Sequence, residues 1–411
     1  MSEPQKDFVE SPEQAAETGS LAARISLSQR AGGIAVPVAT VVLAFLVGGL
    51  VVAATGHNPL LAYRDIFNGA GLNWIFHPTL NTQNIAAYNL TQTLIQSTTL
   101  ILTGLAVAFA FRCGMFNIGG QGQYFVGIAV ANWLGVSFAG MSTLPHVLIA
   151  IVGATLAGAA YAGIAGVLKA TTGAHEVIST IMLNYIALYS LIWIFGDGGP
   201  LQNTLPGGST NPVSNTIANS AQLPVIWGAK GFQGLDIGFF IAVAALVVFW
   251  ALINRTTLGY EVRAVGFNPN AAAYAGINVK KNLIRAMAIS GAFAGLAGGI
   301  DMLGYLYQYG SLDVPVSQVG FLGIGVALLG RNSAVGVFFS AVLFAALLEG
   351  TTFGLTSNVI QPELATWLTY VILGLIVLFV GAEFLILSVW NSRKKLGRRR
   401  AEQAPTAKAA A

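Results

Sequence analysis

Residues 256–281 read TTLGYEVRAVGFNPNAAAYAGINVKK, and this polar segment separates two long apolar runs, residues 237–253 and 283–303. A helix needs about 20 mostly apolar residues to cross the hydrocarbon core of a bilayer. Both runs are close to that length. The segment is therefore predicted to be a polar connection between two membrane-spanning helices.

The composition of the whole chain agrees with a membrane protein. Of its 411 residues, 55% are hydrophobic and only 9% are charged, whereas a soluble domain carries roughly 25% charged residues. So few charges cannot form a water-facing surface, so most of the surface is expected to meet lipid. A chain in lipid must satisfy its backbone hydrogen bonds internally, and we predict an all-α, polytopic transmembrane helix bundle.

About ten spans are expected, and the eighth is the shortest because its apolar core covers only Val319–Leu329. The runs are 34–55, 93–111, 124–141, 144–168, 177–195, 237–253, 283–303, 316–330, 333–350 and 364–388. Residues 31–390 then form one transmembrane domain. A disordered cytoplasmic tail is expected over residues 1–30 and a basic cytoplasmic tail over 391–411.

The basic residues give the predicted orientation. With the N-terminus in the cytoplasm, ten spans place 18 of the 20 lysines and arginines inside, and only Arg64 and Lys230 outside. Both termini are then cytoplasmic. Six of the inside residues form a run in 393–400, which is typical of an anchor near anionic lipid headgroups. We expect the lipid bilayer to be its partner, and no nucleic acid.

Two helices carry small residues at four-residue spacing, a pattern that permits close helix packing. These residues are Gly158, Ala162 and Gly166 in the fourth span and Gly291, Gly295 and Gly299 in the seventh.

The sequence lacks the motifs typical of several kinds of nucleotide-binding and catalytic site. The sequence has no phosphate-binding G-x-x-x-x-G-K-[ST] loop, no H-E-x-x-H and no G-x-S-x-G. The four histidines are scattered, and Cys113 is the only cysteine. Asp301, Glu349 and Glu383 fall near the ends of their spans, whereas a proton-coupled carrier more often has charges at mid-span. We expect no enzyme activity, metal or cofactor in the chain itself.

The segment 256–281 has features of a docking element. Gly259 and Gly266 are predicted to bracket a turn, and residues 271–275 a short helix with Asn270 as its N-cap and Gly276 as its stop. A short cytoplasmic helix of small residues fits the cleft of a partner. An ordinary amphipathic loop is the alternative.

The order of residues here resembles the cytoplasmic coupling loop of the sugar, nucleoside and branched-chain amino acid permeases of ABC importers. The shared pattern is a threonine and a glycine, then Arg-Ala-x-Gly-x-Asn from Arg263, Ala-Ala from Ala271 and Gly-Ile from Gly276. The resemblance covers about residues 90–385. It implies that the residues coupling to an ATPase are Gly259, Glu261, Arg263, Gly266, Asn268, Ala271, Ala272 and Gly276.

Two further motifs, residues 114–123 and 176–185, are similar to those of one nucleoside permease subunit, of guanosine type. That family usually has glutamate where this chain has Gln121, which weakens any role of charge there. The resemblance implies a heterodimer with a second homologous permease in a bacterial inner or plasma membrane. It also implies a cytoplasmic ATPase, which uses the ATP, and an extracytoplasmic lipoprotein that captures nucleoside.

Glycines interrupt two spans, at 114–122 and again at 320–330. Paired broken segments in the two halves of a transporter indicate a transport path, and uncharged amides suit a neutral nucleoside whose base an aromatic ring can stack on. The predicted pathway residues are Phe116, Asn117, Gln121, Gln123, Tyr124 and Asn184. The alternative is that these side chains only satisfy the broken backbone and hold helices together.

The sequence thus favours an ABC importer permease for nucleosides. A simple-sugar permease of ribose or galactose type is the nearest alternative, because substrate choice rests largely on the binding protein. A stand-alone secondary transporter or channel is a different class, and the coupling loop argues against it. The sequence does not identify the nucleoside.

Overall fold

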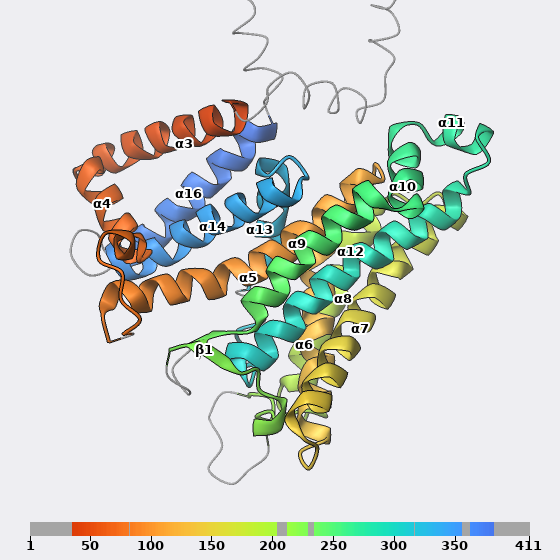
Figure 1. The fold of residues 1–411 in the computed structure, drawn as a ribbon, viewed down its shortest axis with the longest axis horizontal. Helices are drawn as coiled ribbons and strands as arrows, with labels where there is room; N and C mark the ends of the chain where they lie inside the picture. Colours follow the sequence, from red (N-terminus) through yellow and green to blue (C-terminus); the bar gives the residue numbers. More distant parts are fainter. Residues whose placement is uncertain are drawn as a thin grey trace, which may run out of the picture.

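The computed structural model describes residues 35–81, 83–203, 212–228, 234–315, 317–355 and 362–381. Both predicted tails, 1–30 and 391–411, lie outside these residues, as do Lys230 and Glu383. Most of the described chain is helical (Figure 1). The elements are α3 Ala35–Ala54, α4 Pro59–Gly69, η1 Leu72–Phe76, α5 Ile85–Arg112, α6 Gly120–Ser137, α7 Thr143–Thr172, α8 Glu176–Phe195, η2 Asn219–Ala221, β1 Val225–Trp227, β2 Leu235–Asp236, α9 Gly238–Arg255, α10 Thr257–Phe267, α11 Pro269–Tyr274, α12 Val279–Asp301, η3 Met302–Leu306, α13 Val319–Leu329, α14 Ala334–Gly350, η4 Thr351–Leu355 and α16 Pro362–Gly381. The strands β1 and β2 form one antiparallel pair.

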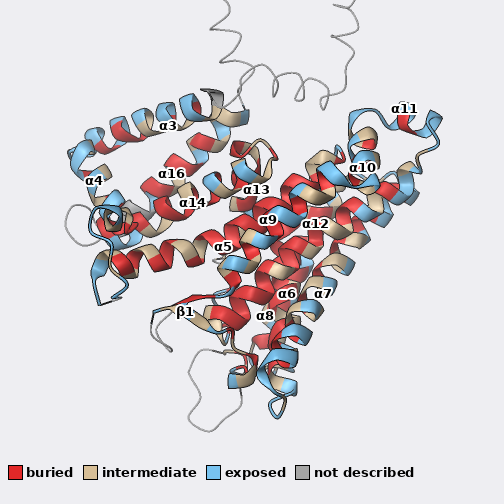
Figure 2. Ribbon diagram, in the orientation of Figure 1, coloured by how far each residue is buried: buried red, intermediate tan, exposed pale blue. Residues whose placement is uncertain are grey.

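Helix α5 is the centre of the bundle. It packs against α9, α12, α13 and α14. Of the residues in its most apolar stretch, 83% are buried inside the chain. Figure 2 shows buried residues along most of its length. A helix enclosed on all sides has no polar face to turn outward, and its hydroxyl side chains bond inward instead. Thr103, for example, donates to the Thr99 carbonyl oxygen at 2.9 Å.

The two small-residue stripes face each other, so the predicted close packing is confirmed as a contact between α7 and α12. A Cβ atom on Gly158 would collide with the carbonyl oxygen of Gly291, and one on Gly295 with the carbonyl oxygen of Ala154. Gly166 lies against Ile284 and Met287 further along α12. Here the absence of side chains lets the two backbones touch.

The outer faces of α7 and α8 are apolar and exposed. In the most apolar stretch of each helix, only 28% of the residues of α7 and 22% of those of α8 are buried. Leu156, Tyr189 and Trp193 are each more than 60% exposed. A water-soluble chain would not expose so broad an apolar face. This surface is suited to lipid or to another membrane subunit.

Seven helical segments of the described chain are long and apolar enough to cross a membrane: α3, α5, α7, α8, α9, α12 continued by η3, and α14 continued by η4. Each of the ten predicted runs overlaps a helix, yet α6, α13 and α16 do not meet the criterion by themselves. The connection between the seventh and eighth predicted spans explains part of the difference, since residues 307–315, 317 and 318 are not helical and α13 has only 11 residues. The ten-span count stays a prediction.

The connections between helices gather at two ends of the bundle. At one end, the turn after α5 lies against α10, and Arg112 bonds the carbonyl oxygen of Asn332 between α13 and α14. At the other end, Trp74 and Trp227 pack with ring centroids 5.7 Å apart. Eight of the nine basic residues in the described segments are at the first end, and only Arg64 is at the second.

The contact between α7 and α12 can be tested with one pair of alanine substitutions. Gly158→Ala forces a Cβ into the backbone of α12, whereas Gly163→Ala, on the same helix, has no atom within 4 Å of its new Cβ. Overpacking of this kind costs about 1–3 kcal/mol. We expect Gly158→Ala to lower the melting temperature in detergent and Gly163→Ala to leave it unchanged or higher. Equal melting temperatures for both variants would contradict the contact.

Candidate functional site

The helix break between α5 and α6 lies where it was predicted, but it is shorter than expected. Residues 113–119 leave the helix, with Gly114 at φ 74°. The prediction that Gly120 and Gly122 also prevent a helix is wrong, because α6 begins at Gly120. These two glycines serve close approach instead. A Cβ on Gly122 would lie 3.0 Å from the Cα of Asn184, and Gly120 lies against Gly320.

Asn117 holds the break together. Its side chain is fully buried, and Nδ2 donates to Gln123 Oε1 at 2.9 Å and to Ser290 Oγ at 2.7 Å. Its Oδ1 accepts from the Gly119 amide at 2.9 Å and from Gln123 Nε2 at 3.0 Å. One amide therefore joins the break to α6 and α12, and Ser290 extends the link by donating to the Ala106 carbonyl oxygen of α5.

Asn184 and Gln121 likewise join α6 to neighbouring helices through hydrogen bonds to the backbone. Asn184 Oδ1 accepts from the Gly122 amide and Nδ2 donates to the Ile118 carbonyl oxygen, both at 2.8 Å. Gln121 Oε1 accepts from the Gly320 amide at 2.7 Å, in the first turn of α13. Both side chains thus satisfy backbone groups that helix ends leave unpaired.

The two aromatic candidates also contact the protein. Tyr124 donates its hydroxyl to Asp301 Oδ2 at 2.8 Å, and Phe116 stacks on Phe111 with ring centroids 5.0 Å apart. The structure therefore brings the six predicted pathway residues into one region where α5, α6, α8, α12 and α13 meet. The hydrogen bonds found there satisfy the broken backbone and hold helices together, as the alternative, structural interpretation of these residues requires. Their role in lining a path stays a prediction.

Asp301 belongs to this region, although sequence reasoning treated it only as a charge near the end of a span. Its side chain is buried, and besides Tyr124 it accepts a hydrogen bond from Thr99 at 2.6 Å. The three residues come from α5, α6 and α12. Thr99 and Asp301 are 202 positions apart in the sequence, so no local pattern could predict this contact. A lone aspartate in a glycine-rich apolar run is the one hint.

The segment between α9 and α12 folds into two short helices. The predicted turn between Gly259 and Gly266 is wrong, because both lie within α10, which Thr256 caps by accepting from the Gly259 amide. The short helix is confirmed as α11, but its N-cap is Asn268 rather than Asn270. Asn268 Oδ1 accepts from two amides of the first turn, and Pro at N1 favours this start.

The predicted stop at Gly276 is confirmed. Its φ of 80° is the left-handed conformation that glycine adopts after a helix.

A groove of about 470 Å³ runs along α10 and α11 at the basic end of the bundle. It is lined by Tyr260, Arg263, Ala264, Phe267, Asn268, Ala271, Ala272, Ala275 and Ile277. Four of the eight predicted coupling residues, Arg263, Asn268, Ala271 and Ala272, are therefore among its lining. Tyr260 and Phe267 are more than 60% exposed, which leaves apolar surface open beside the arginine. Neither ring is among the coupling residues predicted from the sequence.

The other four coupling candidates position the loop. A Cβ on Gly259 would collide with the end of α9, and one on Gly266 with the Arg112 carbonyl oxygen. Glu261 accepts from Asn282 Nδ2 at 2.9 Å, and Gly276 ends α11. These contacts fix α10 against α9, α12 and the turn after α5. Contact of these four residues with a partner stays a prediction.

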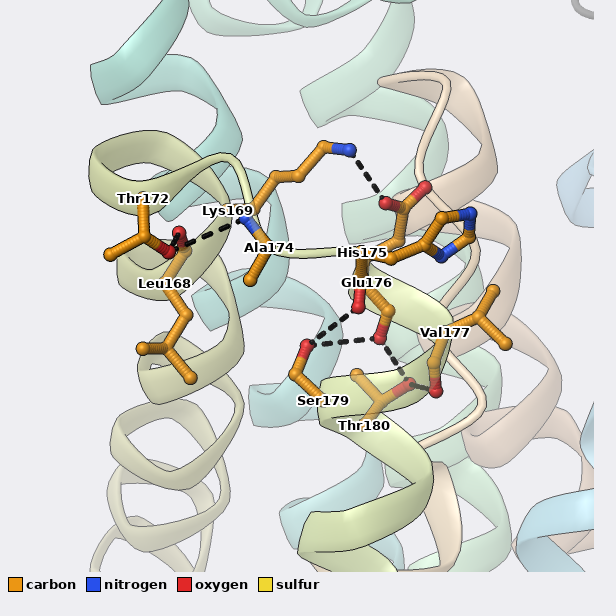
Figure 3. A network of polar contacts seen from close by, with 9 residues as sticks. All are labelled: Leu168, Lys169, Thr172, Ala174, His175, Glu176, Val177, Ser179 and Thr180. Atoms are coloured by element: carbon orange, nitrogen blue, oxygen red, sulfur yellow. Dashed lines mark hydrogen bonds and ion pairs between the residues drawn. The ribbon is translucent and has the colours of Figure 1, made fainter.

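The motif 176–185 forms the start of α8, next to the same end. Figure 3 shows Lys169 of α7 reaching Glu176, with Nζ and Oε2 2.8 Å apart. Ser179 and Thr180 donate to carbonyl oxygens of the preceding turn. This ion pair closes the α7–α8 hairpin, and it gives Glu176 a structural partner within the chain.

Comparisons with known proteins assign these features to a family. The family model of the branched-chain amino acid transport system permease component matches residues 89–381, which include the break and α10–α11. The guanosine ABC transporter permease protein NupP of Bacillus subtilis is 37% identical over 369 residues, which cover 90% of this chain and 99% of NupP. The nucleoside ABC transporter permease protein NupB of Lactococcus lactis is 35% identical over 86% of this chain and 92% of its own. The glucose ABC transporter permease protein TsgB13 of Haloferax volcanii is 32% identical over 90% and 92%.

No solved structure matches the chain. The family match covers most of the sequence, and three relatives above 30% identity extend over nearly all of it. The chain therefore belongs to the family of branched-chain amino acid transport system permease components.

Proposed function

We propose that this chain is a channel-forming permease subunit of an ABC importer that carries nucleosides across a bacterial inner or plasma membrane. The observation that carries the proposal is the 37% identity with a guanosine permease over 99% of that protein's length. A second nucleoside permease matches over 92% of its length. The glucose permease keeps a simple-sugar importer as the second candidate.

The energy for transport enters from a separate cytoplasmic ATPase. The sequence has no phosphate-binding loop, and the groove on α10 and α11 offers aromatic rings, small residues and Arg263 to a docked protein. Eight of nine described basic residues share this end, and basic residues favour the cytoplasmic side. This supports ten spans with both termini in the cytoplasm.

The remaining partners occupy the lateral face and the opposite end. A second homologous permease completes the channel as a heterodimer, and the exposed apolar surface of the bundle is suited to a membrane subunit. An extracytoplasmic lipoprotein delivers the nucleoside to the end that holds Trp74 and Trp227. The buried amides of Asn117, Gln121, Gln123 and Asn184 are uncharged, as a path for a neutral substrate requires.

Charge reversal in the groove tests the coupling role. Arg263→Glu puts a carboxylate at the proposed ATPase contact, so we expect it to abolish nucleoside uptake while the binding protein still captures substrate. Lys280→Glu is the matched control, because Lys280 is exposed at the same end but does not line the groove. Uptake by reconstituted complexes is the measurement. Normal uptake in Arg263→Glu would refute the coupling assignment.

Thiol labelling tests the topology. Asn219→Cys, exposed near β1, should react with an impermeant maleimide from outside, and Thr172→Cys and Ser392→Cys only after permeabilisation. Ala221 is buried and unsuitable as a labelling position. The native Cys113 adds little background, because burial raises the pKa of its thiol to about 12 and the thiolate is the reactive form. Outside labelling of Ser392→Cys would overturn the ten-span arrangement.

The amide network gives a prediction about the path. Asn117→Ala and Asn184→Ala each leave buried backbone or side-chain groups without partners, at a cost of about 1–3 kcal/mol. We expect lower thermal stability in both variants, and lower uptake by the complexes that do assemble. ATPase activity and assembly are measured in parallel, with the exposed Asn254→Ala as control. If both variants transport several nucleosides at normal rates, these residues are structural and do not line the path.

A further inference from the structure

A polar cavity of about 620 Å³ lies at the end of the bundle opposite to the groove on α10 and α11. It is formed by α4, η1, the first turn of α5 and η4; α4 and the start of α5 lie at the left of the bundle in Figure 1. At 1.5 Å per helical residue, the 23 steps of α5 from Asn89 to Arg112 span roughly 35 Å. The cavity is therefore a separate site from the amides of the helix break.

The elements that form the cavity are closely packed. A Cβ on Gly69 of α4 would collide with the Gly350 carbonyl oxygen, and one on Gly354 of η4 with the Asp65 carbonyl oxygen. Thr93 of α5 donates to the Ala70 carbonyl oxygen at 2.9 Å. The cavity is held in one shape by backbone contact between α4 and η4 and by this hydrogen bond from α5 to the end of α4. A preformed shape lowers the cost of ordering a bound ligand.

Two amides in the cavity lack partners. Asn89 is only 5% exposed, and its side chain has no hydrogen-bond partner among the described residues. Asn73 Oδ1 is buried and equally without a partner in the described part of the chain. Buried polar groups are nearly always hydrogen-bonded, and each exception requires an explanation. The amides of the helix break are bonded within the chain, whereas Asn73 and Asn89 line a cavity that a ligand can enter.

The lining has the chemistry of a site for a neutral, hydroxyl-bearing heterocycle. Asn68, Asn73 and Asn89 supply donors and acceptors, and His77 adds a ring nitrogen. Asp65, whose Oδ1 lies 3.5 Å from Arg64 Nη2, offers carboxylate oxygens that can accept hydrogen bonds from hydroxyl groups. Phe353 is 36% exposed and is packed edge-on by Tyr88 at 6.0 Å, which fixes a ring that a base can stack on. Pockets for small ligands have volumes of about 300–1,000 Å³.

We infer that this cavity is an outer binding site, which holds a neutral nucleoside through the Asn73 and Asn89 amides before the nucleoside enters the path between the subunits. The inference rests on the proposed function, and it adds a site that lies largely before the part of the chain that the family model matches, residues 89–381.

Two variants test the site in different ways. Asn89→Leu removes one unpaired amide with little change in size, and Ala86→Phe fills the cavity from the first turn of α5 without removing a polar group. Asn219→Leu is the control, because Asn219 is exposed at the same end and does not line the cavity. The complete importer complex is placed in nanodiscs without binding protein, and guanosine binding is measured by saturation-transfer NMR. Uptake kinetics with binding protein are measured in proteoliposomes.

We expect guanosine to receive saturation in the wild-type complex and in Asn219→Leu. In Asn89→Leu the signal should fall, and the KM for uptake should rise about five- to tenfold with a smaller change in kcat, as the loss of one or two hydrogen bonds predicts. In Ala86→Phe the signal should fall and the KM should rise because the added ring occupies the cavity. A purely structural defect would lower kcat and the yield of complex instead.

Three results would overturn the inference. The first is wild-type binding and KM in both cavity variants. The second is no saturation transfer in the wild-type complex. The third is unchanged guanosine binding with a higher requirement for binding protein, which would show that the cavity receives a protein loop. Failure of the proposed function is distinguishable, because then the wild-type complex takes up no nucleoside at all.

Discussion

A helix that ends inside an apolar bundle leaves amides and carbonyls that no water can reach, and this constraint governs the region around α6. The break after Arg112 is possible only because buried side chains replace the missing backbone bonds. Asn117 binds the Gly119 amide, and Asn184 binds the backbone on both sides of the α6 start. These amides also reach α12 and α8, so the hydrogen bonds that permit the break also decide which helices surround it.

Close packing along α12 complements those hydrogen bonds. A Cβ on Gly298 would collide with the Tyr124 carbonyl oxygen, and one on Gly291 with Gly158 of α7. Larger residues would push α12 away from both α6 and α7. The separation would take Ser290 out of reach of Asn117 and Asp301 out of reach of Tyr124. The glycines therefore contribute to the polar network without taking part in it, by setting the distance at which the network can form.

Sequence reasoning located the helices well, because apolar runs and small-residue stripes are local signals. It was less accurate where two local signals competed. Asn268 and Asn270 are both plausible N-caps, and the proline between them favours the first. Gly120 and Gly122 are typical of a helix break, yet both lie in α6, where the close approach of Gly320 and Asn184 explains them. Partners such as Ser290 for Asn117, 173 positions apart, have no signature in spacing. The cavity at the first turn of α5 was missed for that reason, since its lining comes from four separate elements.

Helix α5 connects the two ends of the bundle mechanically. At one end, the turn that follows α5 packs against Gly266 of α10 so closely that a Cβ atom on Gly266 would collide with it. Arg112 also donates a hydrogen bond to the carbonyl oxygen of Asn332. Asn332 and its neighbour Arg331 hold φ values of 52° and 53°, which are costly for residues other than glycine, so this bond stabilises an otherwise unfavourable turn. At the other end, α5 carries Asn89 into the outer cavity. Since α10 has no free space beside the turn after α5, a movement of α10 toward this turn would also displace the end of α5. A force on α10 in that direction would therefore act on α5, whose other end lines the outer cavity at Asn89.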